Sequence, residues 1–363
     1  MKEKKPTMLT YIGEEQKYLE EMLGRYPKGI PEINGREWLV LATGSSINAA
    51  YSAKYYIEKM TDIIIEIEEP FKFQYYEKLR PEIETVIGIS QSGESTSTIN
   101  ALAEISAGNP SIDTYGMTSN LESEITKVVK ENIDIEMGEE KVGYVTKGFS
   151  VTVFKLMLIG LKESRRRGLI SEAQETAELE NFKKAFKEIP SIIKKTNIFF
   201  QRWREELCKA SRFTALTCGS MIGTAYEMQT KFCETVRIPS QGMDIEVFMH
   251  GPYLEVNPSH QLFFIESNSP LKERLDPLRK YEKQYVNNVY SISLGESSSK
   301  KDDKTIYLNL NEIDEYKASL FLIIPFQILA YHISEALGRH LEHRIYTDFG
   351  VAMQSKTKPG DYV

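Results

Sequence analysis

The sequence VIGISQSGES, from Val86 to Ser95, decides the fold of this chain. Its first four residues form a short apolar run that is typical of a buried strand. Small hydroxyl residues and a glycine follow, and residues 96–107 then have the apolar spacing of a helix. A strand, a short polar loop and a helix in this order predict one unit of a parallel α/β sheet.

The N-terminal half repeats this rhythm on both sides of that stretch. Helices are expected at 47–60 and 96–107, and a weaker segment at 121–129. Strands are expected at 38–42, 63–65, 85–89, 115–118 and 133–135. Strands that alternate with helices of this length predict a doubly wound parallel sheet.

The middle of the chain, residues 149–208, has helical spacing that Pro190 interrupts, and the strand and helix alternation then restarts. The runs LATGSS (41–46) and LTCGSM (216–221) are alike, which predicts two copies of one fold. We therefore expect an α/β protein with two doubly wound parallel-sheet domains and a helical connection. The expected parts are an N-terminal extension (1–34), a first domain (35–190), a second domain (191–345) and a tail (346–363). Further strands are expected at 213–217, 262–265, 289–294 and 306–308, and helices at 221–236 and 271–284.

Composition narrows the class of protein. A length of 363 residues fits two domains, and a net charge of −7 argues against binding to nucleic acid. The three cysteines form no CxxC pair, and the N-terminus lacks the apolar core of a signal peptide. The most apolar run, residues 320–331, is too short for a membrane span and predicts a buried helix. We expect a cytoplasmic protein without a membrane partner.

Two polar loops follow neighbouring strands of the first copy. The 90–95 loop offers Ser90, Gln91, Ser92 and Ser95, and residues 43–46 offer Ser45 and Ser46. Hydroxyl groups, a glycine and the free N–H groups of a helix N-terminus together suit a phosphate group. Either loop alone is equally typical of a helix cap or turn. Two such loops at the carboxyl edge of one parallel sheet favour a ligand site.

The run ISQSGES (89–95) closely resembles the signature of sugar isomerase (SIS) domains, and the two-copy layout resembles double-SIS proteins, over roughly residues 35–350. The resemblance implies that the six serine and glutamine residues of the two loops contact a sugar phosphate. The stretch EKVGYVTKGF (140–149) resembles another family motif, which implies sugar contacts for Glu140 and Thr146. Val145 replaces a serine that the family often has there.

A second set of residues indicates acid–base chemistry. Glu227, Lys231 and Glu234 follow one another at i, i+4 and i+7, hence on one helix face. By pattern alone this is most often a surface salt bridge. The family's run E-G-A-L-K-x-K-E matches these three positions, with Cys233 in place of a lysine, and implies that Glu234 is the base that moves a proton between C1 and C2 of the sugar.

Histidine offers a candidate partner for that base. His250 precedes Gly251 and Pro252 in a turn that matches the family's H-G-P element, which implies ring opening or leaving-group protonation. The other interpretation is a histidine that bonds a neighbouring carbonyl. Glu246 lies one residue too far from His250 for its family role to be transferred. His332 lies in an apolar helix and is expected to be a core residue.

The tail contains two lysines, Lys356 and Lys358. The synthase members of the family carry a tail lysine that reaches the substrate carbonyl, but the context here differs. We expect a mobile, hydrophilic tail.

The replacement of a family lysine by Cys233, together with the variant run VGYVTKGF (142–149), resembles double-SIS deglycases more closely. This resemblance implies an enzyme that cleaves or isomerises a 6-phosphorylated amino sugar conjugate, of the fructosamine or glucoselysine type, by C1–C2 proton transfer without a metal or cofactor. Since the sequence starts just before the first copy, without a glutaminase domain, we do not expect synthesis from glutamine. A glucosamine-6-phosphate isomerase or deaminase, and a sugar-phosphate-binding regulator, remain open. The resemblance also implies a homodimer or larger homo-oligomer whose subunits complete one another's sites.

Overall fold

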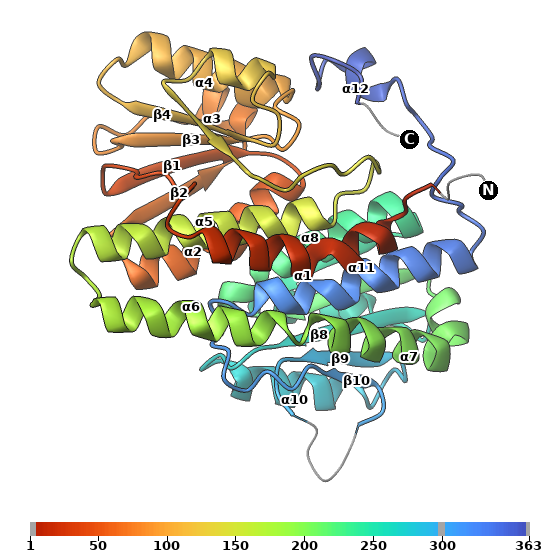
Figure 1. The fold of residues 1–363 in the computed structure, drawn as a ribbon. Coiled ribbons are helices and arrows are strands. Elements are labelled where there is room, and N and C mark those ends of the chain that lie inside the picture. The colour runs from red at the N-terminus through yellow and green to blue at the C-terminus, as the bar shows by residue number, and fades with distance from the viewer. Residues whose placement is uncertain (1–4, 297–301, 361–363) are drawn as a thin grey trace. The chain divides into compact units, whose positions relative to one another are not determined.

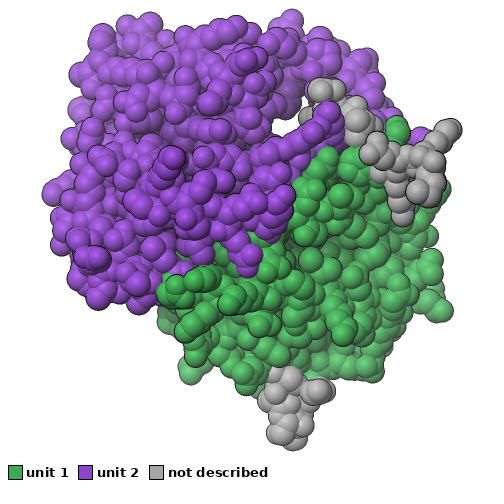
Figure 2. Space-filling view, in the orientation of Figure 1, with its two compact units in different colours: residues 1–16, 180–342 green, residues 17–179, 343–363 purple. Residues whose placement is uncertain are grey.

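The computed structural model of the protein describes residues 5–296 and 302–360 (Figure 1). The chain divides into two compact units, coloured in Figure 2. Unit 1 comprises Met1–Gln16 and Glu180–Glu342, and unit 2 comprises Lys17–Leu179 and His343–Val363. Each unit has its own parallel sheet with helices on both faces, which is the predicted fold class.

Unit 2 contains a five-stranded sheet in the order β2-β1-β3-β4-β5. Helices α3 and α4 lie on one face of this sheet and α2 and α5 on the other (Figure 1). The strands are β1 (Glu37–Ala42), β2 (Ile64–Glu68), β3 (Thr85–Ile89), β4 (Asp113–Thr118) and β5 (Glu131–Asp134). The helices are α2 (Ser45–Met60), α3 (Pro70–Tyr76), α4 (Thr96–Gly108), the short 3₁₀ turn η1 (Glu124–Lys127), α5 (Lys147–Arg166) and α12 (Phe349–Ala352).

Unit 1 contains a second five-stranded sheet in the order β10-β9-β8-β6-β7. The strands are β6 (Arg212–Thr217), β7 (Ser240–Asp244), β8 (His260–Glu266), β9 (Val289–Ser293) and β10 (Thr305–Tyr307). The helices are α7 (Ile189–Cys208), η2 (Gly219–Met221), α8 (Ile222–Lys231), η3 (Phe232–Val236), α9 (Ile245–Met249), η4 (Pro252–Glu255), α10 (Lys272–Glu282) and α11 (Ser319–Ala336). When the order is written from β7, it matches that of unit 2 strand for strand, so the predicted internal repeat is confirmed.

Burial explains why the strands were visible in the sequence. Strands β3 and β9 are buried along their whole length. Helices cover both faces of a parallel sheet, so its inner strands carry continuous apolar runs rather than an alternating pattern. Five of the strands predicted in the first half and four in the second therefore fall on observed strands.

The sequence analysis did not predict helices α1, α3, α9 and α12 or strand β7. Helix α1 (Met8–Arg25) lies in the segment that we expected to be an extension, and the division between the units falls within it. The second division falls within α6 (Glu172–Phe186), while Pro190 occupies the first turn of α7. Proline suits that position, because the first turn needs no N–H donor.

Strand β7 was missed because its sequence, SQGMD, is polar and contains a glycine. The structure requires that glycine: a Cβ at Gly242 would lie 2.3 Å from the carbonyl oxygen of Ala225 in α8. The Gly242 N–H also donates to Gln229 Oε1 at 2.9 Å. Close approach of a helix, rather than strand propensity, therefore selects the residue at this position.

The most apolar helix, α11, was predicted as a buried helix over residues 320–331, and this is confirmed. It is long and apolar enough to cross a membrane, but 78% of it is buried inside the protein. Such burial is what a core helix of a compact unit requires.

Candidate active site

The two polar loops of unit 2 start side by side. Ala42, the last residue of β1, pairs with Ile89, the last residue of β3. The 43–46 loop and the 90–95 loop therefore leave the carboxyl edge of the sheet from adjacent positions, as the sequence predicted. They lead into α2 and α4, whose N-termini lie at this edge. Helix N-termini present N–H groups and a partial positive charge, so the edge is suited to an anion.

The shape of the 90–95 loop depends on Gly93. Its φ is +70°, a region that favours glycine. A Cβ there would also lie 1.7 Å from Ser123 Oγ, so no side chain fits. Gln91, two residues before Gly93, is held by its carbonyl oxygen, which accepts from Ser119 N at 2.9 Å and Ser119 Oγ at 2.7 Å. The loop is thus fixed to the end of β4.

The loop hydroxyls are oriented by the backbone. Ser90 Oγ accepts from Ser95 N at 3.3 Å, and Ser92 Oγ accepts from Glu94 N at 3.4 Å. Each oxygen acts as an acceptor in these bonds, which leaves its own O–H able to donate to another group. Donating hydroxyls are the groups that a phosphate oxygen requires.

Like the 90–95 loop, the 43–46 loop contains a glycine with positive φ and leads into a helix. Gly44 has φ +57° and stands at the N-cap of α2, and Ser45 and Ser46 form the first turn of that helix. Both serines are partly exposed. They therefore lie where a ligand at the sheet edge can be reached, and their sugar-phosphate contact stays a prediction.

Glu140 and Thr146 bind each other. Glu140 Oε1 accepts from the N–H and the hydroxyl of Thr146, each at 2.8 Å, and Oε2 accepts from Gly148 N at 2.8 Å. A carboxylate at the N-terminus of α5 complements the helix dipole. The structure thus gives these residues a capping role, and a direct contact of either with a sugar stays a prediction.

The tail is docked on the 90–95 loop, so the expectation of a mobile tail is corrected. Ser95 and Lys356 form an antiparallel bridge, and Thr96 N donates to Ser355 O at 3.2 Å. Lys356 Nζ donates to Ser92 Oγ at 3.1 Å. No sequence pattern indicated this contact, because a bridge between two residues leaves no periodic pattern.

Contacts of Thr357 and Lys358 also anchor the tail. Thr357 N donates to the carbonyl oxygen of Glu94 at 3.0 Å, and the Thr357 hydroxyl donates to the Glu94 carboxylate. Lys358 Nζ lies 3.4 Å from both Glu94 Oε1 and Glu124 Oε1. Burial lowers the pKa of the Lys356 ammonium, and the Glu94 carboxylate opposes this shift.

In unit 1 three of the four predicted acid–base residues come together, and His250 is not among them. Lys231 Nζ lies 2.6 Å from Glu234 Oε2 and 3.6 Å from Glu227 Oε1. The side chains of Lys231 and Glu227 are fully buried, whereas that of Glu234 is 39% exposed. An exposed surface salt bridge is therefore excluded. The buried Lys231 ammonium therefore pairs with one buried carboxylate, that of Glu227, and with one partly exposed carboxylate, that of Glu234.

The backbone explains how Glu234 reaches Lys231. Residues 232–236 (η3) form a π-helical turn directly after α8, and Arg237 ends it with φ +56°. The wider turn changes the spacing of side chains relative to an α-helix, and such turns are frequent at functional sites. Thr235 Oγ1 donates to Lys231 O at 2.7 Å and stabilises the turn.

His250 lies at the end of α9, and its side chain is 79% exposed. Its Nε2 lies 4.0 Å from Glu246 Oε2, and Glu246 Oε1 also pairs with Arg274 at 2.6 Å. Gly251 follows with φ +144°, a conformation that only glycine adopts readily. His250 is thus available to a ligand or partner, and its role as an acid stays a prediction.

His332 is partly buried rather than a core residue, and both its ring and its Nε2 have partners. Its Nε2 lies 2.7 Å from Asn197 Oδ1, and its ring stacks on Phe200 with centroids 4.9 Å apart. Burial lowers its pKa. The sequence analysis did not single out His260, which is buried, bonds Thr214 Oγ1 at 2.8 Å and has its pKa lowered by burial to about 4.

In unit 1, the loops that correspond to the two polar loops of unit 2 form hydrogen bonds to other residues of unit 1. Ser220 Oγ lies 3.2 Å from the carboxylate of Glu315, and Asn268 Nδ2 donates to Ile313 O at 3.0 Å. Ser269 Oγ accepts from Leu271 N at 3.1 Å. The two sheets therefore share a topology, but they differ in the polar groups that their carboxyl edges present to a ligand.

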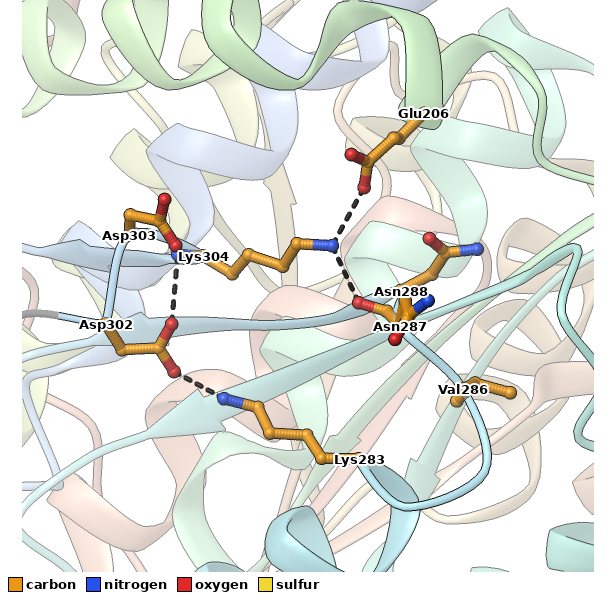
Figure 3. A pocket seen from close by; sticks show the side chains of 8 residues that line it. All are labelled: Glu206, Lys283, Val286, Asn287, Asn288, Asp302, Asp303 and Lys304. Carbon is orange, nitrogen blue, oxygen red and sulfur yellow. Dashed lines mark hydrogen bonds and ion pairs between the residues drawn. The ribbon is translucent and has the colours of Figure 1, made fainter.

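A pocket of about 620 Å³ in unit 1 lies away from these residues (Figure 3). Its lining residues at 286–288 and 302–304 immediately precede β9 and β10, which places the pocket at the amino edge of the sheet. Ligands of open parallel sheets bind at the opposite edge. The lysines there are neutralised: Lys304 Nζ lies 2.8 Å from Glu206 Oε2, and Lys283 pairs with Asp302. Across residues 5–296 and 302–360, no group of three or more His, Cys, Asp or Glu side chains is arranged to hold a metal ion.

The fold is that of an α/β protein with two parallel sheets, and in unit 2 two polar loops lie at the carboxyl edge of the sheet. Residues 34–161 match the family model described as SIS domain. The match covers β1 to β5 and most of α5, and so includes both polar loops.

Relatives and solved structures extend the likeness along the chain. A glutamine–fructose-6-phosphate aminotransferase (isomerizing) of Bacteroides thetaiotaomicron is 26% identical over 315 residues, 85% of this chain and 50% of that protein. A candidate phosphosugar isomerase of Clostridium difficile 630 has a similar structure, with a TM-score of 0.86, 23% identity and coverage of 98% of this chain and 100% of that one. A glucosamine-6-phosphate deaminase of Thermotoga maritima has a TM-score of 0.74, 20% identity and coverage of 92% and 95%. The chain spans about half the length of the curated relatives it matches. At these identities the structural likenesses establish the fold.

Proposed function

We propose that the protein is a sugar-phosphate deglycase or isomerase that acts on a 6-phosphorylated amino sugar conjugate. The observation that carries this proposal is the buried Lys231 ammonium that bonds the partly exposed Glu234 carboxylate. A surface glutamate held by a buried cation has a fixed position, which a general base requires. The SIS domain and the isomerising relative support a phosphorylated sugar as the ligand.

The chemistry on a ketosamine 6-phosphate needs one base and one acid. Glu234 removes a proton from C1 while the C2 carbonyl oxygen gains a proton, which gives an enaminol. Return of a proton to C2 gives an imine at C1, and water hydrolyses it to glucose 6-phosphate and the free amine. Lys231 orients Glu234 by its hydrogen bond, and His250 supplies the proton to oxygen or nitrogen.

The test is an incubation of the purified protein with fructosamine 6-phosphates of lysine and glycine, with glucosamine 6-phosphate and with fructose 6-phosphate. Release of glucose 6-phosphate from the conjugates, measured with a coupled dehydrogenase, supports the deglycase. In D₂O the product should carry deuterium at C2, because a carboxylate base exchanges its proton with solvent. A Glu205→Gln variant, whose side chain is 91% exposed, is the matched control for Glu234→Gln.

Other outcomes separate the alternatives. Ammonia released from glucosamine 6-phosphate identifies a deaminase that uses the same groups, a class represented among the proteins of similar fold. Tight binding of every sugar phosphate without turnover contradicts catalysis and identifies a sensor.

A further inference from the structure

The 90–95 loop contains hydroxyl groups but no basic residue, and its one charged side chain is that of Glu94. A phosphate monoester carries close to two negative charges at neutral pH. Hydroxyls and a helix N-terminus contribute only partial charges to such a ligand. A site of this composition therefore lacks a full positive charge of its own.

Lys356 of the tail supplies a full positive charge at this loop. Within residues 351–360 every residue is exposed except Lys356, which is half-buried. Its ammonium donates to Ser92 Oγ at 3.1 Å. An ammonium can only donate, so Ser92 accepts this bond and keeps its O–H to donate to a ligand. A phosphate oxygen that accepts from Ser92 would lie within reach of the same ammonium.

The neighbouring contacts fix the direction of Lys356. Ser355 O and Thr357 N bond the backbone on either side, to Thr96 N at 3.2 Å and Glu94 O at 3.0 Å. Thr357 bonds the Glu94 carboxylate with its hydroxyl, while Lys356 turns to Ser92.

We propose that Lys356 is a phosphate ligand, and that the docked tail completes the phosphate site of the 90–95 loop. This inference rests on the proposed function, because it assumes that the loop holds the phosphate of the sugar. It assigns the tail lysine to the phosphate end of the substrate and not to the carbonyl end. Burial of the ammonium supports it, since a bound anion would restore the stabilisation that water no longer supplies.

The test compares the affinities of inorganic phosphate and glucose 6-phosphate for the wild-type chain and two variants, by calorimetry. Lys356→Met should weaken both affinities about tenfold or more, because a hydrogen bond to a charged group is lost. Lys356→Arg should keep most of both. Lys130→Met is the control: it removes the same charge from a side chain that contacts Pro110 O and Asp113 at the start of β4. Melting temperatures check that each variant is folded.

The outcomes are distinct. Wild-type affinity for inorganic phosphate in a folded Lys356→Met overturns the inference, and if turnover is lost at the same time, the lysine serves the carbonyl end. A Lys356→Arg variant as weak as Lys356→Met also contradicts a role through charge. If the wild-type chain binds neither ligand, the phosphate site of the proposed function fails together with the inference.

Discussion

The Lys231 ammonium lies 2.6 Å from the Glu234 carboxylate, although Lys231 is fully buried and Glu234 reaches the surface. The same ammonium lies 3.6 Å from the buried Glu227. Removing one member of a buried pair leaves an uncompensated charge, so Lys231→Met should lower the free energy of unfolding by about 3–5 kcal/mol. Urea unfolding measures the loss. A second variant that also carries Glu227→Gln should recover part of it, and equal losses in both would contradict the pairing.

Glu234→Gln keeps the shape of the side chain and removes its basicity. Turnover should fall about 10²- to 10⁴-fold, while binding of sugar phosphate stays nearly unchanged. His250→Asn should have a similar effect, and the double variant should be far from additive if the two act together. Steady-state kinetics with calorimetry measure these effects. More than about a tenth of the wild-type rate in Glu234→Gln would point to another base.

Ser92→Ala removes the hydroxyl that we expect to donate to the phosphate. A lost hydrogen bond to a charged group costs about 1.5–3 kcal/mol, so affinity for glucose 6-phosphate should fall about tenfold or more. Ser106→Ala in α4 is the control, because that hydroxyl bonds Thr114 and the carbonyl of Val128. Unchanged affinity in Ser92→Ala would remove this residue from the site.

Exposed apolar residues flank His250. Val247 is 58% exposed and Leu254 75%. If a second copy covers this face, light scattering should give at least twice the 41.6 kDa of one chain. Leu254→Asp should shift the protein towards a monomer and lower turnover, whereas Leu169→Asp, at an exposed position of unit 2, should change neither. A monomer with full activity would contradict a shared site.

Acid should destabilise the protein through His260. Burial lowers the pKa of His260 from 6.5 to about 4, and Arg212 adds to this shift. Between these values the unfolded chain binds a proton that the folded chain does not, so stability falls as pH drops from 6.5 to about 4. The slope from this residue reaches about 1.4 kcal/mol per pH unit. His260→Gln should flatten urea unfolding midpoints over this range, and His340→Gln, at an exposed position, should not.

Much of the fold was encoded in local pattern. The buried strands of both sheets were visible because parallel strands covered on both faces carry unbroken apolar runs. The likeness of residues 41–46 and 216–221 predicted a repeat, and the strand orders of the two sheets confirm it. Strand β7 could not be predicted, because its Gly242 is selected by the approach of α8.

Of the candidate site, the sequence by itself determined the chemistry: the hydroxyls after β3, the carboxylates and lysine near residue 231, and the histidine before Gly251. Tertiary structure decided what these groups contact. It buried Lys231 and left Glu234 exposed through a π-helical turn, and it brought Lys356 to Ser92 across 264 positions of the chain. The physical reason is that side-chain identity is local, whereas burial and the pairing of charges depend on segments that only the folded chain brings together.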